Sequence, residues 1–285
     1  MRIIVCVKEV GYVYHPLAIR KLGDKIDLEK VVYMINPYDE IAVEEAARIK
    51  DSCKDCEISL ITVGSPRSEK ALRYAFALGG DRMIRIDFET LDPWTTSLVL
   101  AEVIKDLKYD IIFCGKKAID NNAGLVGPYL AELLRIPQVT GIVKMEMQVE
   151  KNQTVVHRYL GRGDRQIVEC SLPALFTVES GLNDPRYPSL ANRLSAETEL
   201  IQVIDLGSLH LGSGSEIELE RFVNLSPPRP KPKRVFTPES NLSASERMRL
   251  IMTGGTSKKK GGLLEGNAND VVEKMIDILI EQDIV

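Results

Sequence analysis

The run Ile3-Ile4-Val5-Cys6-Val7 decides the fold class. A short stretch of uninterrupted apolar residues is typical of a parallel strand that is buried on both faces of its sheet. Asn36-Pro37 then predicts the start of a helix, because proline suits the first helical position and asparagine can accept hydrogen bonds from the first free amides. The alternation continues to about residue 135, with further strands predicted at 58–63, 83–86 and 110–115 and further helices at 71–78, from 92 onward and at 127–134. Repeated β-α-β units of this kind predict an α/β protein with a doubly wound, mostly parallel sheet.

The rest of the chain predicts additions to this sheet and then an arm. Apolar runs at 141–149, 154–160 and 172–178 are expected to be strands that extend the sheet. After about Gly207 the composition changes, and residues 226–234 form a proline- and lysine-rich linker. Short amphipathic helices are predicted at 243–251 and 269–282. We therefore expect a nucleotide-binding domain at 1–207 and, at 208–285, an extended C-terminal helical arm that packs on a partner subunit.

Charge and cysteine content exclude several classes of protein. The 285 residues carry a net charge of -4, which gives no electrostatic drive toward nucleic acid or anionic membrane. No window approaches the roughly 20 apolar residues of a membrane span, and the first apolar run is too short for a signal peptide, so a cytoplasmic location is expected. The five cysteines do not form a disulfide framework. Cys53 and Cys56 have the spacing of a redox or zinc pair, but no second pair follows, and their role stays open.

Candidate ligand residues follow the predicted strands. In an open parallel sheet, ligands bind beyond the carboxyl ends of the strands. Val7-Lys8, Val63-Gly64-Ser65 and Cys114-Gly115-Lys116 lie at such ends, and the loop 118–128 leads directly into a helix whose amides can bind phosphate. An ordinary strand-to-helix connection is an equally good interpretation of this loop. The chain has neither a dinucleotide fingerprint nor a P-loop, and its histidines are scattered, so no self-contained catalytic centre is predicted.

Several segments become distinctive when they are taken together. They are, in chain order, Val5-Cys6-Val7-Lys8, the run from Asn36 to Ala46, the run from Ala77 to Arg82, the run from Gly115 to Asp120, Leu172-Pro173-Ala174 and the run from Leu182 to Leu190. Across about residues 1–205 these segments resemble the beta subunit of electron transfer flavoproteins, more closely the bacterial or archaeal type than the mitochondrial one.

The resemblance implies a Rossmann-like fold and a heterodimer with an alpha subunit that carries redox-active FAD. The beta subunit would bind FAD, or alternatively AMP, and relay electrons from or to an acyl-CoA or other dehydrogenase or a quinone oxidoreductase. By motif position the nucleotide is expected to contact Cys6, Lys8, Asn36, Pro37, Tyr38, Asp39, Val63, Gly64, Asp120, Asn121, Asn122, Ala123, Gly124, Leu125, Val126, Gly127, Pro128 and Ala131. The family's partner-recognition loop corresponds to a segment that includes Pro185, Arg186, Tyr187 and Leu190.

The roles of individual side chains stay open at this point. Lys8 is either a partner for phosphate or a solvated strand end, and Asn36 either caps a helix or also binds a base or ribose. Asp120 is expected to accept from a ribose hydroxyl or from loop amides. Residues 121–125 lack the acidic and hydroxyl side chains that are common in the family loop, which leaves open FAD or AMP and whether the complex bifurcates electrons. The alternative from another class is a redox-silent adenine-nucleotide-binding or signalling module.

Overall fold

The computed structural model describes residues 1–12, 21–22, 25–26, 31–53, 55–89, 92–148, 151–209, 238, 242–252 and 266–281. The chain divides into two compact units, Met1–Ser226 and Pro227–Val285, which are described separately. The division falls at the start of the proline- and lysine-rich segment.

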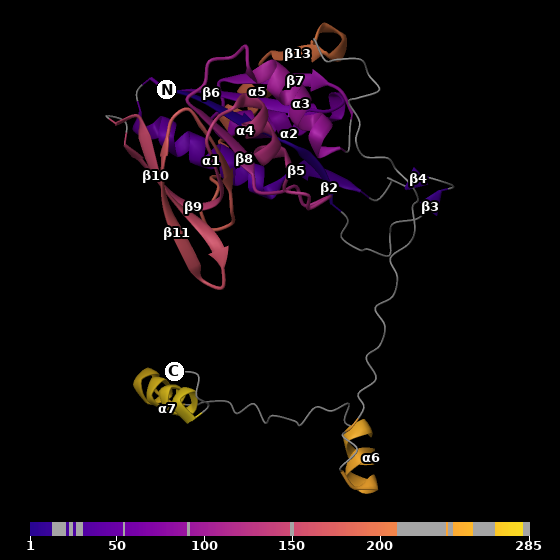
Figure 1. Ribbon diagram of the computed structural model, residues 1–285, viewed down its shortest axis with the longest axis vertical. Helices are drawn as coiled ribbons and strands as arrows, with labels where there is room; N and C mark the ends of the chain where they lie inside the picture. Colours follow the sequence, from indigo (N-terminus) through magenta and orange to yellow (C-terminus); the bar gives the residue numbers. More distant parts are fainter. Residues whose placement is uncertain are drawn as a thin grey trace. The chain divides into compact units, whose positions relative to one another are not determined.

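The first unit is built on a nine-stranded sheet (Figure 1). Its strands, in spatial order, are β11 (Asp164–Ser171), β10 (Gln153–Gly161), β9 (Gln138–Gln148), β12 (Ala174–Val178), β8 (Ile111–Gly115), β1 (Arg2–Cys6), β6 (Glu57–Val63), β7 (Arg82–Asp87) and β13 (Ile201–Asp205). All neighbours from β9 to β13 are parallel, whereas β9, β10 and β11 are antiparallel. The predicted α/β fold with a mostly parallel sheet is confirmed.

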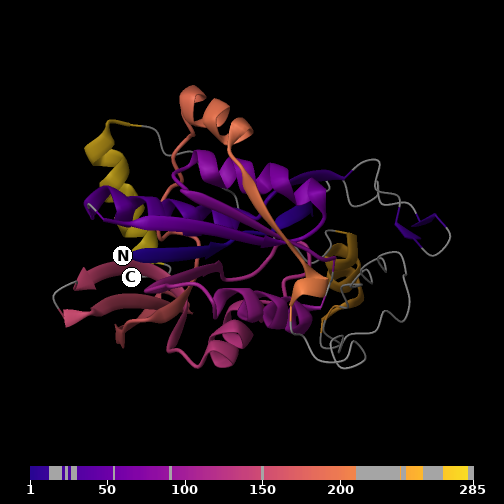
Figure 2. The same ribbon diagram turned by 90° about the horizontal axis from the view of Figure 1, so that it is seen from above.

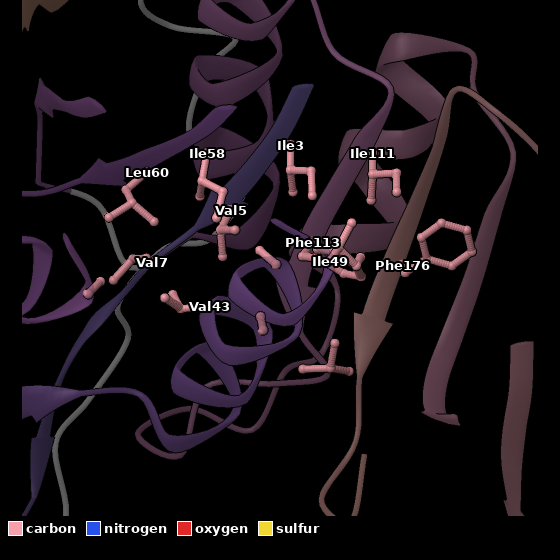
Figure 3. Packing of buried hydrophobic residues seen from close by; sticks show 14 of the residues in the cluster. Ile3, Val5, Val7, Val43, Ile49, Ile58, Leu60, Ile111, Phe113 and Phe176 are labelled. Carbon is pink, nitrogen blue, oxygen red and sulfur yellow. The ribbon is translucent and has the colours of Figure 1, made fainter. Parts of the chain in front are cut away.

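Helices cover both faces of this sheet, as Figure 2 shows. They are α1 (Pro37–Ser52), α2 (Glu69–Ala77), α3 (Pro93–Ile104), α4 (Val126–Leu134) and α5 (Leu190–Thr198). Helices α1 and α2 bury their apolar residues with one face of the sheet, in the cluster that holds Ile3, Phe113 and Phe176 (Figure 3). Helices α3 and α4 bury theirs with the other face, together with Ile4, Ile61 and Ile112. This two-sided burial explains why the strands are continuous apolar runs.

Smaller elements complete the first unit. They are β2 (Glu9–Tyr12) paired with β5 (Val32–Ile35), β3 (Lys21–Leu22) paired with β4 (Lys25–Ile26), and the 3-10 turns η2 (Pro66–Ser68) and η4 (Leu206–Ser208). Strand β2 follows β1 in the chain, and its antiparallel partner β5 comes immediately before α1. This ribbon therefore brings residue 36 back beside residue 8, as the hydrogen bond from the Asn36 amide to the Lys8 carbonyl shows.

Strand β11, strand β13 and helix α5 had no counterpart in the sequence-based prediction. Residues 161–164 do not end the sheet but form the tight turn between β10 and β11, in which Gly161, Arg162 and Gly163 all have positive φ. Strand β11 has no apolar run because most of it is exposed at the edge of the sheet. Helix α5 buries only Ala196 and packs on α2.

The path of the chain creates a crevice at one position in the sheet. From β1 the chain winds outward through β6 and β7, and it then crosses back to place β8 on the opposite side of β1. The connections before and after this crossing cover opposite faces, so they diverge at the carboxyl ends of β1 and β8. Ligands of open α/β sheets bind at such a switch point.

The second unit contains two exposed helices, α6 (Ala244–Met252) and α7 (Ala268–Glu281), close to the predicted bounds. Helix α6 has no buried residue. Helix α7 exposes an apolar stripe formed by Val272, Met275, Ile276 and Ile280. The predicted linker at 226–234 lies outside the described residues. Among the described helices none is both long and apolar enough to cross a membrane.

Candidate functional site

A cavity opens at the switch point between β1 and β8. The space among its walls, counted out to open solvent, is about 790 Å³. Buried apolar side chains line its deeper part, among them Ile61, Leu100 and Cys114. Lys8, Lys116 and Lys117 add positive charge to the wall. The site therefore combines an apolar lining with cations, as a nucleotide requires.

Many of the residues expected from the sequence lie in this wall. They are Cys6, Lys8, Asn36, Asp39, Val63, Asn121, Ala123, Gly124, Leu125, Val126 and Gly127. Others of the expected set are not in the wall, namely Pro37, Tyr38, Gly64, Asp120, Asn122, Pro128 and Ala131.

The set expected by motif position lacks ten further wall residues, which are Val7, Ile61, Pro93, Thr96, Leu100, Cys114, Gly115, Lys116, Lys117 and Ala118. Five of these, Val7, Cys114, Gly115, Lys116 and Ala118, are candidate ligand residues by sequence, because they lie at the ends of predicted strands or in the loop 118–128. The wall residues of α3, which are Pro93, Thr96 and Leu100, could not be found from the sequence in this way. The periodicity of a helix does not indicate which strand end the helix will cover.

The carboxylate of Asp39 joins the two strand ends at the cavity. Its Oδ2 accepts from the Lys8 amide at 2.8 Å, and its Oδ1 accepts from the Gly115 amide at 3.0 Å. Asn36 Nδ2 donates to the same Oδ1 at 2.9 Å. Asp39 is 5 % exposed, and burial raises its pKa to about 7, although hydrogen bonds from Asn36, Lys8 and Gly115 act in the opposite direction. This carboxylate is thus part of the scaffold of the cavity.

Asn36 holds the loop that follows β8 and does not cap α1 with its side chain. The expected cap is wrong, because no hydrogen bond links the Asn36 side chain to the first amides of the helix. Instead, Nδ2 donates to the Lys117 carbonyl at 3.0 Å, and Oδ1 accepts from the Ile119 amide at 3.2 Å. Both hydrogens of the amide group are used by Asp39 and Lys117, so Asn36 positions the cavity wall.

The lysines of the wall differ in their partners. Lys8 Nζ lies 2.8 Å from Asp120 Oδ2, and Lys116 pairs with the buried Glu179. In the described ranges, Lys117 has no acidic partner for its ammonium group. The Lys8 ammonium group therefore forms an ion pair and is not simply solvated at the end of a strand. Asp120 also accepts from the Asn121 amide at 2.7 Å, as expected for a carboxylate that orders loop amides.

Helix α4 begins at the mouth of the cavity. Its N-cap residue is Leu125, which offers no side-chain acceptor, and its first residues Val126 and Gly127 are part of the wall. A helix amino terminus favours an anion because its first amides are free and its dipole is positive there. Lys8, Lys117 and this helix end together favour a phosphate group.

The expected partner segment lies elsewhere, along the second half of α1. Arg186 donates to Glu44 through Nε at 2.8 Å and to Asp51 through a terminal nitrogen at 2.8 Å, so it is bound within the chain. Pro185 is half-buried beside it. Tyr187 is 95 % exposed and Leu190, the first residue of α5, is 74 % exposed. Two apolar side chains therefore project from a segment that is held firmly at Arg186.

The described part of the chain contains no group of three or more His, Cys, Asp or Glu side chains that could hold a metal ion. Cys53 and Cys56 are free thiols, and burial raises the pKa of Cys56. The geometry thus supports binding at the cavity and provides no three-ligand metal centre among these residues.

Comparisons with known proteins agree with this arrangement. The family model for the electron transfer flavoprotein domain matches residues 25–208. The electron transfer flavoprotein subunit beta of Bacillus subtilis is 35 % identical over 235 residues, which cover 80 % of this chain and 89 % of that protein. The subunit beta of Methylophilus methylotrophus is 28 % identical over 99 % of this chain and 98 % of that protein. The caffeyl-CoA reductase-Etf complex subunit CarD of Acetobacterium woodii is 34 % identical over 71 % of this chain and 78 % of that protein.

Replacing Gly115 by alanine is expected to destabilise the site. An added Cβ would lie 2.2 Å from Asp39 Oδ1 and 2.8 Å from Tyr38 Cβ, so the Asp39–Gly115 hydrogen bond must break. We expect Gly115→Ala to lower the free energy of unfolding by about 1–3 kcal/mol, measured by urea denaturation. Gly207→Ala is the matched control, because Gly207 is exposed and not part of the cavity wall, and its added Cβ would come no closer than 3.1 Å to Asp205 Oδ1. Equal stabilities of Gly115→Ala and wild type would contradict the assigned geometry.

The pH dependence of stability should carry the signature of Asp39. Its pKa of about 7 in the folded protein exceeds its ordinary value of 3.8, so the folded state binds the proton more tightly. Stability from this group is therefore fully present below about pH 4 and is lost as the pH rises to about 7, by at most about 4 kcal/mol. The measurement is the difference in unfolding free energy between wild type and Asp39→Asn at pH 4 to 8. The other carboxyl groups are present in both proteins, so their contribution to the pH dependence cancels in this difference. A difference that stays constant with pH would refute this assignment.

Proposed function

This chain belongs to the electron transfer flavoprotein family, whose beta subunits it resembles, and on that premise we propose that it binds FAD in the cavity between β1 and β8 and relays electrons together with an alpha subunit that carries its own FAD. The observation that carries the proposal is the cavity itself. It lies at the switch point of the sheet, and it combines apolar walls with lysines and a helix amino terminus. The donors present fit an adenylate with its phosphates.

The residues of this chain would have distinct roles toward the nucleotide. Lys8, Lys117 and the first amides of α4 are placed to bind phosphate oxygens. Ile61, Leu100 and Pro93 offer apolar surface to a ring. Asp39 and Asn36 hold these walls in position. Bound FAD would supply the redox chemistry, and the protein supplies orientation and electrostatics.

We favour FAD over AMP as the nucleotide, with AMP as the alternative. FAD carries a pyrophosphate, and Lys117 adds a cation for which no acidic partner is present in the described residues. The loop after Asp120 contains Asn121, Asn122 and Ala123, so it does not add further negative charge to the mouth. A wall with more cations than anions supports a ligand with more than one phosphate group.

The exposed surfaces support a role in an assembly. The apolar stripe of α7 and the exposed apolar residues of α6 match a C-terminal arm that packs on an alpha subunit. We propose that Tyr187 and Leu190, with Pro185 and Arg186 behind them, contact the electron-transfer partner. The relative from Acetobacterium woodii is named as part of a caffeyl-CoA reductase-Etf complex, which supports an acyl-CoA dehydrogenase as partner. We extend the proposal to electron bifurcation, for which the cavity would hold a second FAD. A quinone oxidoreductase is the other partner considered.

Counting the nucleotides in the purified complex tests the proposal. The chain is co-expressed with its alpha subunit, the complex is denatured, and FAD and AMP are separated by chromatography. Two FAD per heterodimer are expected. A count of one FAD and one AMP per heterodimer would mean that AMP, and not FAD, binds in the cavity, and it would argue against bifurcation. A colourless chain that forms no flavoprotein complex would overturn the proposal in favour of a redox-silent nucleotide-binding module.

Leu190→Ala is expected to weaken the functional contact with the electron-transfer partner. Removal of an exposed apolar side chain that is buried in an interface costs about 1–2 kcal/mol or more, so we expect KM for the dehydrogenase to rise at least about fivefold. Nucleotide content should not change, because Leu190 is not in the cavity wall. Ile167→Ala on β11, which is 65 % exposed, is the control for loss of an exposed apolar side chain. Identical KM values for wild type and Leu190→Ala would refute the role of this residue.

A further inference from the structure

Two cysteines lie side by side at the switch point of the sheet. Strands β1 and β8 are parallel neighbours, with Ile4 opposite Ile112 and Val5 opposite Phe113, and the next residues are Cys6 and Cys114. Neighbouring strands lie about 4.8 Å apart. A hydrogen bond from Cys114 to the Cys6 thiol, together with burial, raises the pKa of Cys114 well above its ordinary value. The two thiols are therefore in direct contact.

Both thiols also belong to the wall of the cavity. A cysteine in a sheet usually acts as a small apolar side chain, and Cys170 fits that description, since it is buried away from the cavity. Cys6 and Cys114 differ from it because a small ion can reach them through the cavity mouth. The chain thus places a pair of sulfur ligands in the wall of an open cavity.

We propose that Cys6 and Cys114 form a two-coordinate site for a soft monovalent cation, Cu⁺ or Ag⁺, and that this cation and the nucleotide exclude one another. Thiolates select soft cations such as Cu⁺. A monovalent soft cation is satisfied by two sulfur ligands, whereas zinc is almost always bound by four ligands in structural sites. Since the described residues hold no group of three possible ligands, the site discriminates against zinc.

The charge balance of the site also favours this assignment. Each thiol loses one proton when its sulfur binds, so two thiolates and one monovalent cation leave a single negative charge. Lys117, which has no acidic partner among the described residues, lines the same cavity and stabilises that charge. Lys8 and Lys116 are already paired with Asp120 and Glu179. A charged Asp39 beside Cys114 acts in the opposite direction. Because two protons are released, the apparent affinity for the cation should increase with pH.

The cation and the nucleotide exclude one another because both use the same cavity wall. A cation held between Cys6 and Cys114 lies in the wall of the space that a nucleotide would fill, and the anionic dithiolate complex draws on the same positive charge as a phosphate. This part of the inference rests on the proposed function. The dithiol site itself does not, since its ligands are present whether or not a nucleotide binds.

The experiment is a titration of the purified full chain with Ag⁺, followed by calorimetry and by thiolate absorption in the ultraviolet. Cys53→Ser/Cys56→Ser serves as the background, because this second pair of thiols would also bind the ion. One Ag⁺ per chain is expected in that background. Adding Cys6→Ser or Cys114→Ser should weaken binding at least about a hundredfold, and adding Cys170→Ser should not change it. Circular dichroism and thermal unfolding establish that each variant is folded.

Two further measurements complete the test. X-ray absorption of the Cu⁺-loaded background variant should give two sulfur neighbours, which tests the site even if a serine variant does not fold. Saturating AMP or FAD should weaken Ag⁺ binding at least tenfold. Unchanged affinity in a folded Cys6→Ser variant, or three or more ligands on the metal, would overturn the site. Unchanged affinity in the presence of a nucleotide that is shown to bind would overturn the exclusion, and absence of nucleotide binding would count only against the proposed function.

Discussion

The carboxylate of Asp39 is the group on which the rest of the site depends. Parallel strands are held together along their length by backbone hydrogen bonds, but at the switch point the chains beyond β1 and β8 leave in different directions. Asp39 accepts from an amide on each side of this divergence, at Lys8 and at Gly115. It fixes the width of the crevice where backbone pairing has ended. Glycine at position 115 is required because the side chains of Asp39, Tyr38 and Asn36 approach too closely for an added Cβ.

Helix α1 connects the cavity with the exposed segment around Leu190 and holds both in place. Asn36 and Asp39 at its start hold the cavity wall, and Glu44 in its middle holds Arg186. The Glu44 side chain is 3 % exposed. Burial alone would raise its pKa, but hydrogen bonds from Arg186 and Arg48 reverse this effect and lower it. One helix thereby positions two functional surfaces, because its buried acidic groups each find donors from segments far away in the chain.

The electrostatics of the cavity explain why it suits several ligands of related chemistry. Lysine ammonium groups and the start of α4 favour negative charge, and the raised pKa of about 7 leaves the buried Asp39 only partly charged near neutral pH, while Cys114 keeps its proton there. The wall is therefore more positive than a count of its side chains indicates. A phosphate and an anionic dithiolate complex are stabilised by the same groups, which is the physical basis for their exclusion of one another.

The sequence by itself determined the alternation of strands and helices and the carboxyl-end location of the ligand loop. These features depend on residues that are near one another in the chain, so periodicity and end signals reveal them. Leu190 was singled out only by the resemblance to a known family. Only the tertiary structure decided that Asp39 pairs with Gly115, that Lys8 pairs with Asp120, and that α3 supplies part of the wall. The residues in each of these pairs are 76 and 112 positions apart, respectively. No local pattern encodes such contacts, because they arise from the order in which the strands assemble and from the burial that this order creates.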